Sequence, residues 1–336
     1  MNAKKMVGMM AVMMLATANP SVADVFNMGT GLTSLELVTV GNPGNSPDTR
    51  YATPGYGAVD YTYNIGKYEV TTGQYTAFLN AVAGTDTYGL YDTSMWTSNS
   101  GCQIQRSGSS GSYTYSVAAD YANRPVNCVS WGSAARFVNW LTNGQPTGAQ
   151  GLLTTEDGSY YLNGAVTDAA LMTVTRKANA RYVIPTEDEW YKAAYYKNDG
   201  ATGDYFDYPT SNDAVPSNQL IDPDPGNNAT YGHTIGYPYY RTEVGAHENS
   251  ESPYGTFDQG GNVMEWNEAV ISGILRNVRG GAYQTGDAVL QASFRTSDTP
   301  ATEGTNLGFR VAEVPEPATL SFLAFGCLAM IRQRRM

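Results

Sequence analysis

Residues 254–266 read YGTFDQGGNVMEW, and the interpretation of the whole chain starts from this stretch. Its adjacent glycines, Gly260 and Gly261, permit positive φ angles and a close approach of backbone segments. Carboxylate and carbonyl oxygens at short intervals around such a bend are the ligands that calcium takes. A tight turn before a buried strand, with Trp266 in the core, explains the same residues without an ion. The spacing alone leaves both interpretations open.

Three further blocks occur in a fixed order around this stretch. They read IGKYEVT at 65–71, IPTEDEW at 184–190, and RGGAY at 279–283 closing with NLGFRV at 306–311. Together with GGNVMEW at 260–266, they resemble the signature segments of the formylglycine-generating enzymes, also called sulfatase-modifying factors. The resemblance covers roughly residues 60–312. It implies an α+β fold of the C-type-lectin-like type, rich in loops, with short strands and about three helices.

Both ends of the chain carry targeting patterns, which divide it into four segments. Residues 1–23 are predicted to be a signal peptide, with two lysines, an apolar run and small residues at 21–23. Residues 24–60 hold a strand and a loop, and residues 61–312 form the formylglycine-generating-enzyme-like domain. Residues 313–336 resemble the PEP-CTERM sorting signal of Gram-negative bacteria, which an exosortase recognises and processes. A simple tail anchor is the alternative for this short apolar run and its basic end.

Local patterns predict where helices and strands begin. Thr71 with Gln74, and Thr186 with Glu189, fit capping boxes, and Ser130 fits the N-cap of a further helix. Residues 198–259 show almost no periodicity, which is unusual inside one domain unless bound ions organise the loop. Strands are expected at 35–40, 61–65, 181–184, 274–278, near Phe294 and at 309–311.

Charge and cysteine content narrow the partners and the compartment. The formal net charge is −11, and removal of the two basic ends makes the remaining domain more acidic still. This disfavours nucleic acids and anionic membrane surfaces as partners. Cys102 and Cys128 either form one disulfide in an oxidising compartment or remain two buried thiols, and Cys327 lies in the C-terminal apolar segment.

The resemblance implies a calcium site at the central loop. Its ligands would be Asp258 and Glu265 by side chain and Gly261 and Val263 by carbonyl, a hard oxygen set that suits calcium. A second calcium site would begin at Asn228 and Ala229. Residues 230–242 contain no Asp or Glu, so its later carboxylate has no match in this chain.

The catalytic pair of the resembled enzymes is missing. Those enzymes bind copper(I) and activate oxygen with two cysteines between the RGG and NLGFR blocks, as a soft ion requires. Residues 282–306 contain no cysteine here, which argues against copper and against conversion of a sulfatase cysteine. The whole chain has two histidines, His233 and His247, too few for a three-histidine iron site.

Two functions therefore stand side by side. The first is an exported, surface-sorted binding or structural protein, stabilised by calcium, at the cell envelope or in an exopolysaccharide matrix. Besides the exosortase, its partner would be an extracellular polysaccharide or peptide, and it would meet the membrane only through its C-terminal segment before processing. A ligand groove is predicted at Tyr283, Gln284, Asp287, Gln291 and Arg295.

The second function is an oxidoreductase of the same superfamily that uses another metal or cofactor. It requires a new set of reactive side chains in place of the cysteines. The candidates are Asp287, Glu303 and His247, if the fold brings them together.

Overall fold

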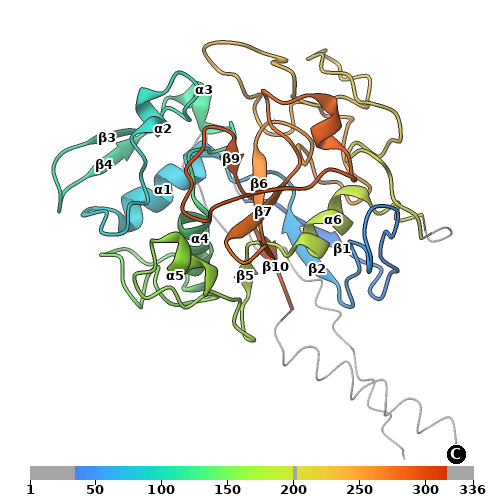
Figure 1. The fold of residues 1–336 in the computed structure, drawn as a ribbon. Helices are drawn as coiled ribbons and strands as arrows, with labels where there is room; N and C mark the ends of the chain where they lie inside the picture. Colours follow the sequence, from blue (N-terminus) through green and yellow to red (C-terminus); the bar gives the residue numbers. More distant parts are fainter. Residues whose placement is uncertain (1–34, 200–202, 316–336) are drawn as a thin grey trace, which may run out of the picture.

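Two four-stranded sheets carry the fold in the computed structural model, which describes residues 35–199 and 203–315 (Figure 1). The first sheet is antiparallel throughout. Ile65 lies opposite Val38 on one side and Ala312 on the other. The late strand of the chain therefore sits between two early ones. The strand order is β1 (Leu37–Val40), β2 (Tyr63–Gly66), β10 (Ala312–Glu313) and β5 (Tyr182–Val183).

The second sheet contains the end of the GGNVMEW block. Its pairs are antiparallel except for the parallel pair of β6 with β9, and the register of β6 against β7 shifts after Trp266. Trp266 is completely buried, which confirms the turn followed by a buried strand. The order is β8 (Thr296–Asp298), β7 (Leu275–Arg279), β6 (Met264–Ile271) and β9 (Leu307–Gly308). A separate hairpin pairs β3 (Gln105–Ser107) with β4 (Thr114–Ser116).

Three helices begin where the capping patterns predict. They are α1 (Thr72–Val82), α4 (Trp131–Thr142) and α6 (Glu187–Tyr195). Both capping boxes are formed, and the Ser130 hydroxyl accepts the Ser133 N–H at 3.1 Å. These side chains satisfy donors that the first helical turn leaves free.

The predicted count of about three helices is too low for the described residues. Three short helices and one 3₁₀ turn were missed because four or five residues carry no measurable period. They are α2 (Ser94–Thr97), α3 (Ala119–Ala122), α5 (Asp168–Met172) and η1 (Asp287–Leu290). In the described part of the chain, no helix is both long and apolar enough to cross a membrane.

The strand expected at 309–311 is wrong by a few residues, because β9 and β10 lie on either side of it. Phe309 and Val311 are nevertheless buried, and their carbonyls accept the N–H groups of Val70 and Gly66 at 2.9 and 2.7 Å. The side chain of Phe309 packs edge-on against Phe137 of α4 at 5.3 Å between ring centroids. This link therefore joins the end of the chain to the helical side of the core.

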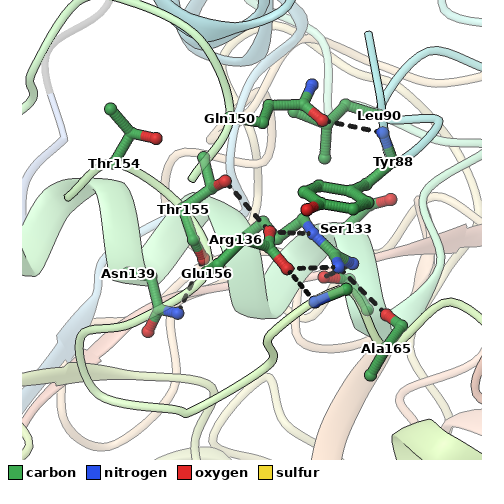
Figure 2. A network of polar contacts seen from close by, with 12 residues as sticks. Tyr88, Leu90, Ser133, Arg136, Asn139, Gln150, Thr154, Thr155, Glu156 and Ala165 are labelled. Carbon is green, nitrogen blue, oxygen red and sulfur yellow. Dashed lines mark hydrogen bonds and ion pairs between the residues drawn. The ribbon is translucent and has the colours of Figure 1, made fainter. Parts of the chain in front are cut away.

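One long loop is fixed to α4 by a buried ion pair. The Arg136 guanidinium donates to both carboxylate oxygens of Glu156, at 2.6 and 2.9 Å, while the Tyr88 ring lies against it (Figure 2). The Gly164 N–H and the Thr155 hydroxyl also donate to Glu156, at 2.7 and 3.0 Å. The loop after α4 is therefore held by side chains of the protein itself.

A second long loop region covers the opposite side of the molecule, yellow to orange in Figure 1, away from α1, α4 and α5. It has no regular element between Tyr195 and Met264 among the described residues. Isolated bridges organise it, including Tyr196 with Tyr205 and Thr230 with Gly261. The candidate site lies where this region meets β6.

Candidate functional site

The glycine motifs meet back to back at the start of the site. Gly261 has φ +96°, and a Cβ there would lie 2.2 Å from the Thr230 carbonyl oxygen. Gly280 has φ +95°, and a Cβ there would lie 2.5 Å from the Gln259 carbonyl oxygen. The Gly261 N–H donates to the Gly280 carbonyl at 2.8 Å. Only glycine allows both the conformation and the contact, so these residues fix the corner from which Glu265 projects.

Glu265 is fully buried and neutralised within the protein. Arg310 donates to both of its carboxylate oxygens at 2.5 Å, and the Trp190 indole N–H adds a bond of 2.7 Å. The remaining Arg310 N–H groups reach the carbonyls of Gly66 and Phe257 at 2.8 and 2.9 Å. This two-oxygen ion pair ties the GGNVMEW block to the NLGFRV block.

Two other carboxylates near this pair have no cation of their own. Asp258 adopts φ +60° and accepts the Gly245 N–H at 2.6 Å, and burial raises its pKa to about 6. Glu69 is 1% exposed, and neither of its carboxylate oxygens has a hydrogen-bond partner. Burial, followed by the charges of Asp258 and Glu265, raises the pKa of Glu69 well above its usual value. Three carboxylates thus share one guanidinium, that of Arg310.

This charge balance suits a cation, but the donor set differs from the expected one. The carboxylate of Glu265 is already occupied by Arg310, whereas both oxygens of Glu69 are unpaired and Asp258 accepts the Gly245 N–H. Within residues 35–199 and 203–315, no three His, Cys, Asp or Glu side chains are arranged to hold a metal ion. Glu69 lies in the quoted IGKYEVT block, yet no local pattern shows that its side chain turns towards Asp258.

The second expected calcium site also contains an unpaired oxygen. Asn228 Oδ1 is buried without a hydrogen-bond partner, while its amide nitrogen donates to Asp224. The Ser250 hydroxyl and the Asn249 N–H donate to the same carboxylate at 2.7 and 2.9 Å. Ala229 donates its N–H to the Ser217 carbonyl at 2.9 Å. The family resemblance implied an acidic ligand after Asn228, whereas in the structure the acidic residue beside Asn228 is Asp224, which precedes it.

The residues of the predicted groove make separate contacts in the structure. Tyr283 is buried, the Gln291 amide donates to the Tyr208 hydroxyl at 2.7 Å, and Arg295 pairs with Glu187 at 2.5 Å. Asp287 begins η1, and Gln284 is exposed. These contacts do not test whether the five side chains share a binding surface, so the groove stays a prediction.

A groove of about 760 Å³ is lined mainly by residues of the segment 235–246. These residues did not stand out in the sequence. Tyr237 is 74% exposed at this surface, and Arg124 lies 3.9 Å over the ring of Tyr239. The Tyr239 hydroxyl donates to Asp120 at 3.0 Å, which fixes the ring from its other end. The lining residues are Arg124, Leu220, Ile235, Gly236, Tyr237, Pro238, Tyr239, Thr242, Glu243, Val244, Gly245 and Ala246.

The groove and the carboxylate cluster share hydrogen bonds. Gly245, in the groove wall, donates its N–H to Asp258, and Thr242 donates its N–H to the Asn262 side-chain oxygen at 3.1 Å. The segment 242–246 is therefore held by the same loop that carries the unpaired charge.

The reactive candidates of the sequence do not meet. Cys102 and Cys128 are free buried thiols, so the disulfide is not formed, and burial raises the pKa of both. His247 contacts Thr230 at 3.0 Å, whereas Glu303 lies beside Asp92, whose charge raises the Glu303 pKa after burial. His247 and Glu303 thus have different neighbours, and among the described residues Asp287, Glu303 and His247 do not form a group that could hold a metal ion.

These motifs and their arrangement define a sulfatase-modifying-factor domain. The family profile described as "Sulfatase-modifying factor enzyme 1-like domain" matches residues 38–314, and the chain belongs to this family. The match begins earlier than the predicted start at residue 61, because β1 is part of the first sheet.

Solved structures share the fold at low sequence identity. Treponema denticola variable protein 1 is 21% identical with a TM-score of 0.51, and the match covers 84% of this chain and 96% of that one. CarF is also 21% identical with a TM-score of 0.51, over 84% of this chain and 99% of its own. PvdO from Pseudomonas aeruginosa is 17% identical with a TM-score of 0.46, over 85% and 96%. The search of curated proteins gave no match.

Proposed function

We propose that this protein is an exported binding protein with a C-type-lectin-like scaffold, stabilised by calcium and without formylglycine-generating activity. Its groove would hold an extracellular polysaccharide. The observation that carries the proposal is the 760 Å³ groove lined by tyrosines, whose wall hydrogen-bonds to the charged loop. The signal peptide and residues 316–336 of the PEP-CTERM-like segment, which support export and surface sorting, lie outside the described residues, while Glu313 is part of β10.

The thiol content argues against the chemistry of the resembled enzymes. The segment after the RGG block contains Thr285, whose hydroxyl closes a turn by donating to the Ala282 carbonyl at 2.9 Å. The two cysteines of the described chain are buried elsewhere, with thiol pKa values raised by burial. A protonated, buried thiol is a poor ligand and a poor nucleophile.

The groove chemistry favours a sugar ring over a charged ligand. An exposed tyrosine ring gives a flat apolar face, and the polar rim can hydrogen-bond to hydroxyls. Arg124 and Glu243 contribute one charge of each sign, so neither sign dominates. Tyr239 is held by Arg124 and by Tyr121, at 5.3 Å between ring centroids. A ring fixed before binding loses little conformational entropy when the ligand arrives.

Calcium would act on this groove through Asp258 and Glu69. A cation beside these carboxylates would offset charge that the protein leaves uncompensated. Because Asp258 accepts the Gly245 N–H, a fixed Asp258 would also fix the groove wall. Calcium removal is therefore expected to weaken polysaccharide binding as well as to lower stability.

The test is binding of purified protein to exopolysaccharide from the producing cells, with and without EDTA. We expect saturable binding in calcium, loss of at least tenfold in Tyr237→Ala, and no change in Tyr161→Ala, an exposed tyrosine outside the groove. Binding of a neutral peptide library but not of polysaccharide would show that the ligand of the groove is a peptide. No binding to either would contradict the proposal.

Export has its own test, which does not depend on the ligand. Mass spectrometry of protein from the cell surface should show an N-terminus near residue 24 and loss of the C-terminal segment. Replacement of the Pro-Glu-Pro residues at 315–317 should leave the C-terminus unprocessed. Retention of both ends in surface protein would contradict the sorting proposal.

A further inference from the structure

A cavity of about 120 Å³ opens at the start of α4, apart from the tyrosine groove and the carboxylate cluster. It lies between α4, the segment after α5, and strands β6 and β7. Its rim includes the exposed residues Thr175 and Val270. The lining residues are Trp131, Tyr160, Met172, Val174, Thr175, Arg176, Glu268, Val270 and Arg276.

Arg276 brings a buried positive charge to this cavity. It is 2% exposed, and its terminal nitrogens donate only to main-chain carbonyls in the described part of the chain. Those bonds reach Glu268 and Leu171 at 2.9 Å and Val174 at 2.6 Å. The Nε–H has no acceptor at all. The charge of Glu268 acts on Arg276, but none of these hydrogen bonds goes to a carboxylate oxygen. A buried cation without a directly paired anion is costly.

The neighbouring carboxylates are already committed to other groups. Glu268 accepts bonds from Arg176, at 2.9 Å, and from the Tyr160 hydroxyl. Asp298 lies opposite Arg276 on β8, but its carboxylate accepts from the Thr299 N–H and the Thr302 hydroxyl, both at 2.8 Å. Arg276 is therefore left with the face of Trp131, 3.5 Å below its guanidinium carbon.

Trp131 supplies a second unsatisfied donor. It is completely buried, and its indole N–H has no acceptor. The other buried tryptophans all have one: Trp140 donates to Pro146, Trp190 to Glu265, and Trp266 to Val129, at 2.7 to 2.9 Å. Because more than nine-tenths of buried N–H groups are paired in proteins, two orphan donors on one cavity are unusual.

The geometry points to a small carboxylate as the occupant of this cavity. We propose that Arg276 Nε–H and Trp131 Nε1–H donate to its two oxygens, while the guanidinium offsets its charge. Water would fill the space with about four molecules and satisfy the donors, but it would leave Arg276 without a directly hydrogen-bonded carboxylate. The size of the cavity admits a formate or acetate, or the carboxylate group of a larger acidic molecule whose body stays outside.

The test follows the indole N–H of Trp131 by ¹⁵N–¹H NMR on the whole mature protein, titrated with sodium acetate against sodium chloride at constant ionic strength. The signal is assigned from its loss in Trp131→Phe, which keeps the aromatic face and removes the donor. We expect a saturable downfield shift of this one signal with acetate and not with chloride.

Variants separate the proposed site from a general salt effect. Acetate affinity, measured by calorimetry, should fall at least fivefold in Trp131→Phe and at least tenfold in Arg276→Met. It should be unchanged in Trp96→Phe, an exposed tryptophan away from the cavity. Because Arg276→Met removes three buried hydrogen bonds and is expected to lower stability, Trp131→Phe with a wild-type melting temperature carries the test.

Two ligands distinguish the sources of the carboxylate. If glucuronate binds with the same dependence on Trp131, the cavity accepts the acidic group of a larger molecule. If acetate alone binds, it accepts a free small acid. An indole signal that does not move, or acetate binding that is equal in wild type and Trp131→Phe, would overturn the proposal.

Discussion

The two long loop regions of this protein lack regular structure to a similar degree but treat buried charge in opposite ways. In the loop after α4, Glu156 receives two bonds from Arg136 and further bonds from Gly164 and Thr155 (Figure 2). In the loop before β6, Asp258 receives one N–H, and the adjacent Glu69 receives none. In the first loop Glu156 is neutralised by Arg136, whereas at the end of the second loop the carboxylates of Asp258, Glu69 and Glu265 share the guanidinium of Arg310.

This difference shows that a structureless loop can be ordered by two distinct means. A buried carboxylate is tolerated when donors surround it, as around Glu156. Where donors are missing, the folded state either protonates the group or takes a cation. The pKa values of Asp258 and Glu69 are raised, which favours protonation, the first of these two outcomes.

The largest loss of stability is expected when the ion pair that holds the loop after α4 is removed. Arg136→Met leaves the Glu156 carboxylate buried without its cation, which should cost about 3–5 kcal/mol of the free energy of unfolding. Urea unfolding with calcium and with EDTA should give the same loss. The double variant with Glu156→Gln should recover part of it, since the stranded charge is gone. A loss that depends on calcium would contradict the distinction between the loops.

The next largest effect on stability is expected from calcium binding at the second loop region. Calcium at a hundred times its dissociation constant should stabilise the protein by about 2.7 kcal/mol, and EDTA should remove this increment. In Glu69→Gln, the increment should fall to less than half, because one carboxylate is lost without a change in shape. Differential scanning calorimetry of both proteins measures it. Equal increments in the two would exclude Glu69 from the site.

A pH dependence should follow from Asp258. Its pKa is raised to about 6, so the folded state holds a proton there that the unfolded state has already released. Without calcium, this group should lower stability as pH rises from about 4 to 6, by roughly 1–2 kcal/mol after screening. The calcium increment should grow over the same range. Asp258→Asn should flatten both curves, and unchanged curves would show that another group titrates.

The smallest expected effect lies outside both loops, where two acids adjoin without a cation. Burial and then the charge of Asp92 raise the pKa of Glu303 to about 8. The unfolded state ionises Glu303 earlier, so wild type should lose stability as pH rises towards 8. Glu303→Gln should gain about 1 kcal/mol at pH 8 by chemical denaturation. This gain should be the same with calcium and with EDTA, unlike the effect of Asp258→Asn. A gain that changes with calcium would show that Glu303 and Asp258 respond to the same ion.

Features set by neighbouring residues were predictable from the sequence. The capping boxes at Thr71 and Thr186 and the cap at Ser130 are formed as expected, because each involves residues three apart. The buried strand at Trp266 was one of two open interpretations. The motif order also identified the family correctly.

Features that depend on distant contacts were not predictable. Glu69 and Arg310 stood in quoted blocks, but their roles come from strands that bring them beside Asp258 and Glu265. The groove at Tyr237 and Tyr239 has no periodic pattern, since its loop is ordered by single bridges. The contacts of Gln291 with Tyr208 and of Arg295 with Glu187 join residues far apart in the sequence, so they could not be predicted, and the groove around Tyr283 stays a prediction.

The position of β10 in the first sheet determines when this sheet can form during synthesis of the chain. Ala312 pairs with Ile65 on one side and Val183 on the other, so the middle strand of the first sheet is the last to leave the ribosome. Until then, β2 and β5 expose unpaired edges, and the sheet cannot close. For the proposed export, this order means that the first sheet is still open while the chain passes a secretion channel, and its completion afterwards would oppose the return of the chain.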